Sequence, residues 1–403
     1  MPQLLPFAGL RPDPAVVGPL ADVVCPPYDV ISGPERAALM ARSPYNVVRL
    51  ELPNGHYKEA ARLLGEWYAS GALKREAAPA LYGYRMTSTA PDGTEIHTLG
   101  VLGALVLEPP GQGILPHEQT TPKAKTDRLE LIRATQANTS PIWCLSTQPG
   151  LAEAIGHKPL IGARREDGTG AVRDDDGVLH EIWPIFDPRV HEQVARLIGA
   201  GPVLVADGHH RYEVALAYQT EARAEGTMAG PGCVLALVVE LAEEHLHVQA
   251  IHRLVSGLPP EFDAVRALQG AFALEPTSAA NGQLLAEMQS SGALGVMTRR
   301  GTWLARPRAN IPLVPGGADR DLDSSRADAA LLSWPPHSLQ YEASLASIAG
   351  ALRSGQADLA LLCRPATVGQ IAGTAHGGER MPPKTTYFWP KPRTGMVLRD
   401  FSA

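Results

Sequence analysis

The chain has 403 residues, 44% of them hydrophobic, and no apolar run approaches the roughly 20 residues needed to span a membrane. Its formal net charge of −6, with no block of Lys and Arg, argues against a nucleic-acid-binding protein. Four scattered cysteines without metal-type spacing, and an N-terminus without a basic region followed by an apolar stretch, predict a cytoplasmic protein that is not secreted.

The first candidate residues follow a stiff turn near the N-terminus. An apolar run over residues 23–25 leads into Pro26-Pro27, whose fixed φ angles and missing donors restrict the chain. Tyr28 and Asp29 lie at the exit of this turn, and we take them as candidate substrate-binding residues. The Asp29 carboxylate is suited to binding a substrate amine or an arginine side chain. The alternative is that it only caps the local turn.

Regular elements are predicted next. Ser32 and Glu35 have the spacing of a capping box, which predicts a helix over residues 33–42. The apolar spacing of residues 56–70 predicts a second amphipathic helix. Strand-forming residues on both sides of an Ala-Pro-Asp-Gly turn predict an antiparallel hairpin over residues 79–108.

A polar cluster at residues 116–128 precedes an apolar helical period. A neighbouring His and Glu, with Lys and Arg close by, are the residue types that phosphoryl transfer needs, because a carboxylate can deprotonate the acceptor hydroxyl and cations stabilise the transferred group. His117 and Glu118 are the candidate catalytic residues, with Glu118 as the general base. Lys125 and Arg128 are candidate phosphate-binding residues, and Thr120 is a candidate substrate-binding residue. The alternative is a solvated loop that only begins a helix.

The central stretch, residues 202–223, predicts a buried strand, a polar turn and a helix. Apolar residues 203–206 form the strand, and the helical period starts at Tyr212. The turn consists of Asp207, Gly208, His209, His210 and Arg211. The first turn of a helix attracts anions, an arginine there adds a bidentate donor, and glycine lets a ligand approach the backbone, so we predict a phosphate site. The alternative is that Asp207 caps the helix and the two histidines form a polar surface turn.

The chain ends in an unusual proline-rich and aromatic tail, residues 381–401. We expect an α+β unit over residues 257–403, after a core over residues 1–256, with the tail packing back on this core as a strap. The residues suited to close over a phosphate are Lys384, Thr385, Thr386 and Lys391. The alternative is a purely structural strap.

Two resemblances to known families involve these motifs. Residues 207–211, followed by a helix, resemble the phosphate-binding signature of the ParB/sulfiredoxin superfamily, which includes partition proteins, sulfiredoxins and free-serine kinases. A second resemblance covers nearly the whole chain, because motifs at residues 7–12, 26–32, 117–128, 207–211 and 381–388 occur in the order of the bacterial and archaeal family called domain of unknown function 1015.

The resemblance implies an α+β (mixed α/β) fold: a ParB/sulfiredoxin-like nucleotide-binding core with β-hairpin insertions, followed by a second α+β unit. The catalytic cysteine of sulfiredoxins has no counterpart, since His209 stands in its place. Sulfinic acid reductase activity is therefore not expected.

We expect a kinase that transfers a phosphoryl group from ATP or ADP to the hydroxyl of a small metabolite, with free L-serine as the first candidate. Asp207 would position Mg²⁺ or the acceptor, and residues 208–211 with Lys125, Arg128 and Lys384 would bind phosphates. Two alternatives stay open: a nucleotide-binding regulator without turnover, and a phosphoester hydrolase. No nucleic-acid or membrane partner is expected, and a homodimer is one option for assembly.

Overall fold

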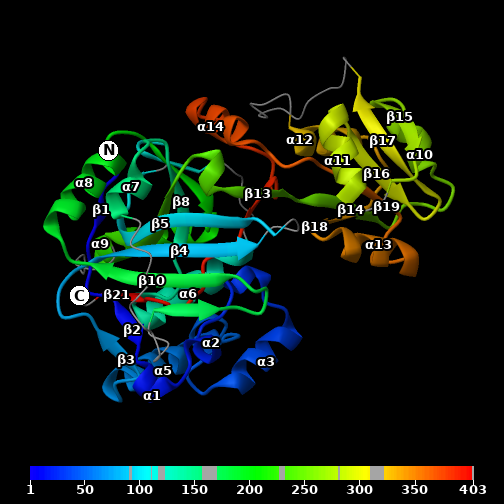
Figure 1. The fold of residues 1–403 in the computed structure, drawn as a ribbon. Helices are drawn as coiled ribbons and strands as arrows, with labels where there is room; N and C mark the ends of the chain where they lie inside the picture. The colour runs from blue at the N-terminus through cyan, green and yellow to red at the C-terminus, as the bar shows by residue number, and fades with distance from the viewer. Residues whose placement is uncertain are drawn as a thin grey trace. The chain divides into compact units, whose positions relative to one another are not determined.

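The computed structural model describes residues 1–89, 93–109, 111–116, 123–156, 170–226, 232–279, 282–308 and 322–401. They form two compact units (Figure 1). Within the described residues, unit 1 is built from residues 1–116, 123–246 and 390–401, and unit 2 from residues 247–389. The boundary expected from the sequence, at residues 256 and 257, lies inside unit 2, because β13 (His247–Ala250) pairs with β20 (Thr386–Trp389).

The main sheet of unit 1 mixes parallel and antiparallel strands. Its order is β6 (Ile114–Pro116), β11 (Val203–Asp207), β8 (Ile142–Ser146), β12 (Cys233–Glu240), β5 (Glu95–Val106), β4 (Leu81–Thr89), β10 (Leu179–Ile185) and β9 (Ala171–Arg173), and β1 (Leu4–Leu5) also pairs with β5. Strand β11 runs parallel to β6, and β12 runs parallel to β8. Strands β4 and β5 are antiparallel neighbours, which confirms the predicted hairpin.

Helices of unit 1 pack on this sheet and on one another. They are α1 (Pro14–Val17), α2 (Leu20–Val23), the 3₁₀ helix η1 (Tyr28–Val30), α3 (Gly33–Arg42), α4 (Val48–Glu51), α5 (Tyr57–Ala69), α6 (Lys123–Thr135), α7 (Leu151–Ile155), α8 (Pro188–Gly199), α9 (His209–Glu225) and the 3₁₀ helix η2 (Glu243–His245). The Ser32–Glu35 capping box is present, and α3 has the predicted bounds. Val194 and Ile198 of α8 are fully buried in the same cluster as Val203 and Val205 of β11, so apolar burial fixes the strand that leads to the central motif.

The last residues of the chain belong to unit 1. Strand β21 (Arg399–Asp400) pairs with β7 (Ala137–Asn138), and single bridges join Cys25 to Thr394 and Leu10 to Leu398. A further small sheet pairs β2 (Leu10–Pro12) with β3 (Leu73–Arg75). The end of the tail is therefore held by backbone hydrogen bonds at several positions, which brings its side chains to fixed places in unit 1.

Unit 2 has its own sheet and its own core. The strand order is β15 (Phe272–Thr277), β17 (Gly301–Pro307), β16 (Leu294–Thr298), β19 (Leu359–Leu362), β14 (His252–Ser256) and β18 (Ser338–Glu342). Its helices are α10 (Ala264–Leu268), α11 (Gly282–Ser291), α12 (Asp323–Leu331), α13 (Leu345–Ser354) and α14 (Val368–His376). Leu294, Val296 and Leu361 are buried together on one face of the sheet, and Leu284 and Leu362 belong to a second apolar cluster.

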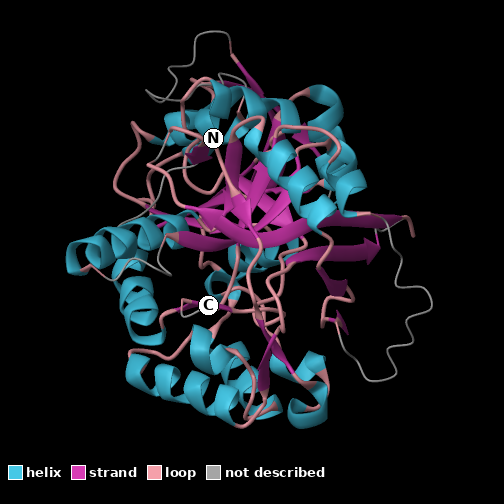
Figure 2. Ribbon diagram, turned by 90° about the vertical axis from the view of Figure 1, so that its left-hand side faces the viewer, coloured by secondary structure: helices cyan, strands magenta, loops and turns pink. Residues whose placement is uncertain are grey.

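The protein is thus of mixed α+β class, and Figure 2 shows its helices and strands. Both units contain helices and strands. The expected second α+β unit is present as unit 2. Along the part of the chain that the structure describes, we find no helix with the length and apolar character that crossing a membrane requires.

Candidate functional site

The central motif lies where β11 meets α9. The strand ends at Asp207, Gly208 has a φ of 89°, and α9 begins at His209. A Cβ atom on Gly208 would approach Arg211 Nε and Ile142 Cγ2 to 3.0 Å, so the left-handed backbone and the tight packing both favour glycine. The helix starts at His209 rather than at Tyr212, because Gly208 makes the whole turn by itself. His209, His210 and Arg211 consequently form the first turn of the helix.

Asp207 is paired with two cations. Arg211 Nη2 donates to Asp207 Oδ2 at 2.8 Å, and Lys391 Nζ donates to Asp207 Oδ1. The exposed fractions of these side chains are only 9% for Lys391, 11% for Arg211 and 20% for Asp207. Burial raises the pKa of Asp207, but Lys391 and Arg211 lower it by more, so the pKa lies well below its usual range. Asp207 therefore stays ionised throughout the neutral range.

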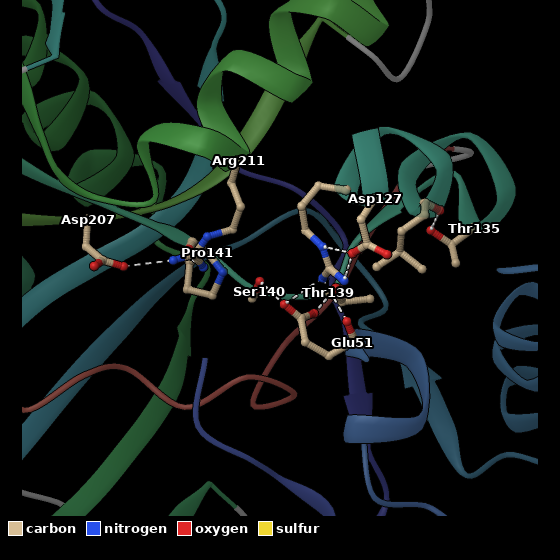
Figure 3. A network of polar contacts seen from close by, with 10 residues as sticks. Glu51, Asp127, Thr135, Thr139, Ser140, Pro141, Asp207 and Arg211 are labelled. Carbon is tan, nitrogen blue, oxygen red and sulfur yellow. Dashed lines mark hydrogen bonds and ion pairs between the residues drawn. The ribbon is translucent and has the colours of Figure 1, made fainter. Parts of the chain in front are cut away.

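Arg211 is also held by the backbone of a neighbouring strand. Its Nη1 atom donates to the carbonyl oxygen of Pro141, just before β8, as Figure 3 shows. The buried Nε atom has no hydrogen-bond partner among the residues that the structure describes. Burial lowers the pKa of Arg211, but Asp207 and the exposed Asp29 raise it by more, so the guanidinium remains charged.

A second polar network adjoins Arg211 (Figure 3). Arg128 of α6 is buried; its Nη1 atom donates to the carbonyl oxygen of Glu51 at 2.7 Å, and its Nη2 atom donates to Asp127 at 2.6 Å. Ser140 donates to the buried Glu51 carboxylate at 2.9 Å, and Thr139 donates to its other oxygen. This network holds the Arg128 guanidinium in a fixed position.

Tyr28 links the two arginines. The guanidinium carbon of Arg128 lies 4.3 Å from the centre of the Tyr28 ring, and that of Arg211 lies 6.0 Å from it. A small cavity of about 40 Å³ is also lined by both Arg128 and Arg211, together with Glu51. A volume of this size holds about three water molecules. The structure therefore brings together Tyr28, Arg128 and Arg211, which the sequence predicts from three separate motifs.

The other predicted site residues lie in α9 or in unit 2, or the residue or its side chain lies outside the described residues. His209 and His210 are half-buried in the first turn of α9. Lys384 belongs to unit 2, where its carbonyl oxygen accepts a hydrogen bond from Arg253 at 2.9 Å. Lys125 lies on α6, but its side chain is outside the described residues. The residues His117, Glu118 and Thr120 also lie outside the described residues. The roles predicted for all of them stay predictions.

Glu51 is a site residue that local sequence patterns did not reveal. It ends the short helix α4 within a mostly apolar stretch, and it is almost fully buried. A charged residue surrounded by apolar neighbours is the one signal that points to it, because a buried carboxylate needs partners such as Arg128.

Metal binding at Asp207 has no support from this geometry. Both carboxylate oxygens accept hydrogen bonds from cationic groups, and a divalent ion placed there would repel Lys391 and Arg211. Among the described residues, no group of three or more His, Cys, Asp or Glu side chains is arranged to hold a metal ion. We therefore derive no step from a metal at Asp207.

Comparison with known proteins gives a family match. Residues 4–325 match the model of a family described as "Protein of unknown function (DUF1015)", which confirms the wider resemblance seen in the motifs. The narrower resemblance, to the ParB/sulfiredoxin signature, stays a prediction. A comparison with curated proteins finds no significant match.

Several solved structures are distantly similar. A free serine kinase in complex with AMP is 13% identical, with a TM-score of 0.37, over 68% of this chain and 83% of that chain. A conserved hypothetical protein from Pyrococcus furiosus is 13% identical, with a TM-score of 0.36, over 70% and 88%. SbnI with a C-terminal truncation, from Staphylococcus aureus, is 14% identical, with a TM-score of 0.39, over 73% and 85%. With such low TM-scores we draw no functional conclusion from these likenesses.

Proposed function

This chain belongs to the DUF1015 family, and for this member we propose that unit 1 binds the phosphate groups of a nucleotide at the N-terminus of α9. We further propose that it transfers a phosphoryl group to the hydroxyl of a small metabolite, with free L-serine as the first acceptor to test. ATP and ADP are the donors to test first.

The observation that carries the proposal is the charge arrangement around Asp207. Two cations, Lys391 and Arg211, pair with the one carboxylate of Asp207, so two positively charged side chains lie together at this point. This point lies at the start of a 17-residue helix, whose first turn presents backbone N–H groups and the positive end of the dipole. Both features attract the oxygens of a phosphate group.

The neighbouring cavity extends this positive region. Arg128 and Arg211 both line it, and the Glu51 carboxylate on its wall is engaged by Thr139 and Ser140. Its volume of about 40 Å³ excludes a whole nucleotide. Under the proposal, the base and ribose therefore lie outside it, and only a phosphate group approaches the two arginines.

The proposed reaction has a simple balance of atoms. The hydroxyl oxygen of the acceptor forms a bond to the terminal phosphorus, and the bond from that phosphorus to the bridging oxygen of the nucleotide breaks. The acceptor proton passes to the predicted base, Glu118. Lys391 and the N–H groups of the first turn of α9 stabilise the charge on the transferred group, and Asp207 accepts a hydrogen bond from the acceptor.

A turnover assay tests this function. The purified chain is incubated with ATP or ADP and L-serine, and phosphorus NMR follows the formation of a phosphate monoester. We expect a new monoester signal that Asp207→Asn abolishes and that Arg62→Ala, at an exposed ion pair on α5, leaves unchanged. The function would be abandoned if wild-type protein consumed neither nucleotide with L-serine or with other hydroxyl acceptors present.

A further inference from the structure

A buried polar cluster connects the tail to the main sheet of unit 1, and the proposed function does not use it. It consists of Tyr84 on β4, His180 on β10, Asp174 in the turn between β9 and β10, and Arg393 of the tail. Strands β4 and β10 are antiparallel neighbours (Figure 1). The exposed fractions of these four side chains are 1%, 0%, 6% and 9%, so all four are shielded from water.

The contacts within this cluster form a closed chain that begins and ends at Arg393. The backbone N–H of Arg393 donates to Tyr84 Oη at 3.0 Å, and this oxygen lies 3.0 Å from His180 Nδ1. His180 Nε2 lies 3.0 Å from Asp174 Oδ2. Arg393 Nη2 lies 2.9 Å from the same carboxylate oxygen. Arg393 is therefore held at two points, through its backbone and through its guanidinium group.

The protonation states of the cluster suit these contacts. Burial raises the pKa of Asp174, but the hydrogen bond from His180 and the charge of Arg393 lower it by more, so the carboxylate is ionised. Burial also lowers the pKa of His180, so its imidazole is neutral at neutral pH. An ionised carboxylate only accepts, so the imidazole proton is on Nε2, and Nδ1 accepts from the Tyr84 hydroxyl. Asp174 consequently offers a charged acceptor to Arg393.

Three members of the cluster are fixed by unit 1 without the tail. Tyr84 and His180 belong to paired strands of the main sheet. Asp174 is held by its own turn, because its Oδ1 accepts from the backbone N–H of Asp176 at 3.0 Å and from that of Val178 at 2.9 Å. Its other oxygen is free to turn towards the tail only in one direction. The cluster is thus a preformed receptor for one tail side chain.

The chain between this receptor and the phosphate site is short and stiff. Only Pro392 separates Arg393 from Lys391, and the proline ring holds its φ angle at about −65°. Two residues span at most about 7 Å, so an anchored Arg393 restricts where the backbone of Lys391 can lie. Lys391 in turn forms the ion pair with Asp207. On the other side of the anchor, Thr394 exchanges backbone hydrogen bonds with Cys25.

We propose that this polar cluster positions the Lys391 ammonium group against Asp207, so that Arg393 is a positioning residue for the phosphate site and does not itself touch the phosphate. The consequence for phosphate binding rests on the proposed function. The positioning is a property of the chain without ligand. If the backbone bridges alone held the tail, removing the Arg393 side chain would leave Lys391 in place.

Chemical labelling of Lys391 tests the positioning without any nucleotide. The folded chain is treated briefly with an amine-acetylating ester, and peptide mass spectrometry compares the labelling rate of Lys391 with that of Lys74, which is 67% exposed. Burial and the ion pair should make Lys391 react slowly in wild type. Arg393→Gln should raise its rate relative to Lys74 by about tenfold, because a charge-assisted contact that holds the tail is lost.

Two further variants separate this cluster from a general loosening of the tail. Arg75→Gln removes an ion pair with Asp400 on β21 but keeps the backbone pairing of this strand, and it should leave the labelling rate of Lys391 unchanged. Tyr84→Phe removes only the hydroxyl that accepts from Arg393, and it should raise the rate. Arg393→Gln decides the test where it folds, and Tyr84→Phe decides it where Arg393→Gln does not fold. The proposal is wrong if the deciding variant is labelled at the wild-type rate, or if Arg75→Gln raises the rate equally.

A double-variant comparison links the cluster to the phosphate site. Pyrophosphate with Mg²⁺ is titrated into wild type, Arg393→Gln, Lys391→Met and the double variant. Because Arg393 acts through Lys391, the double variant should bind pyrophosphate as tightly as Lys391→Met does, and an additional loss would overturn the indirect role. Failure of wild type to bind contradicts the proposed function, whereas the labelling rates still decide the positioning of Lys391.

Discussion

Lys391 forms an ion pair with Asp207, a residue 184 positions earlier in the chain. The contact joins the end of the tail to the turn between β11 and α9, so the C-terminal segment is part of the candidate site. Because Lys391 is only 9% exposed, its charge is screened little by solvent, and the pair has a larger electrostatic effect than a surface ion pair.

Replacing Lys391 should therefore destabilise unit 1. Lys391→Met removes one of the two cations that keep Asp207 ionised, and we expect a loss of about 3 kcal/mol in the free energy of unfolding. Lys74→Met is the matched control, because Lys74 is 67% exposed and pairs with Asp13 at the surface; it should cost under about 1 kcal/mol. Urea unfolding of both variants measures the difference, and equal losses would contradict a buried, coupled pair.

Tyr28 should contribute through its ring rather than its hydroxyl. The ring faces Arg128 at 4.3 Å, so Tyr28→Phe keeps the cation–π contact while Tyr28→Leu removes it. We expect Tyr28→Leu to lower the free energy of unfolding by about 1–2 kcal/mol more than Tyr28→Phe does. Thermal unfolding of the two variants tests this; a larger loss in Tyr28→Phe would show that the hydroxyl matters more than the ring.

The sequence was sufficient for elements whose signals are local. The Ser32–Glu35 capping box set the bounds of α3, and the turn between two strand-forming runs predicted the β4–β5 hairpin. The apolar pattern predicts that α9 starts at Tyr212, which is wrong, because one left-handed glycine, Gly208, makes the turn and the helix begins at His209.

Contacts between distant segments could not be read from local patterns. The sequence pattern indicates Lys391 only as one of several tail residues suited to a phosphate, and its pairing with Asp207 depends on how β21 and the bridge at Thr394 place the tail. The Tyr28, Arg128 and Arg211 cluster likewise needs three segments to fold together. Local periodicity carries no information about such distances.

Unit 2 should lose stability in mild acid because of His252. This side chain is 2% exposed, its Nδ1 accepts a hydrogen bond from the Cys363 N–H at 3.1 Å, and burial lowers its pKa from 6.5 to about 4. The unfolded chain binds the proton more readily than the folded one does. The contribution of neutral His252 to the stability of the fold is therefore complete above pH 6.5 and is lost as the pH falls towards about 4.

For wild type, protonation of His252 should lower the free energy of unfolding by about 3 kcal/mol. His252→Asn keeps an acceptor for the Cys363 N–H but does not titrate, so its stability should change less over this pH interval. Urea unfolding of both proteins at about pH 7 and about pH 4 compares the two changes. An equal change in both proteins would assign the acid sensitivity to other groups.

Glu118→Gln distinguishes a kinase from a nucleotide-binding regulator. Loss of a general base should lower kcat by about 10²–10⁴-fold while the affinity for nucleotide is kept, because the phosphate-binding residues are unchanged. Parallel turnover and binding measurements on this variant provide the test. Unchanged kcat would remove Glu118 from the proposed reaction, and an absence of turnover in wild type would favour the regulator.

The central claim is that Arg211 and its neighbours form a phosphate site, and isothermal titration tests it most directly. Wild type, Arg211→Ala and the control Arg133→Ala, whose arginine is exposed on α6, are titrated with ATP, ADP, CTP and pyrophosphate in the presence of Mg²⁺. We predict that at least one of these ligands binds wild type and Arg133→Ala equally, and binds Arg211→Ala about tenfold or more weakly. Binding of none of them to wild type, or equal binding to folded Arg211→Ala, would contradict the claim.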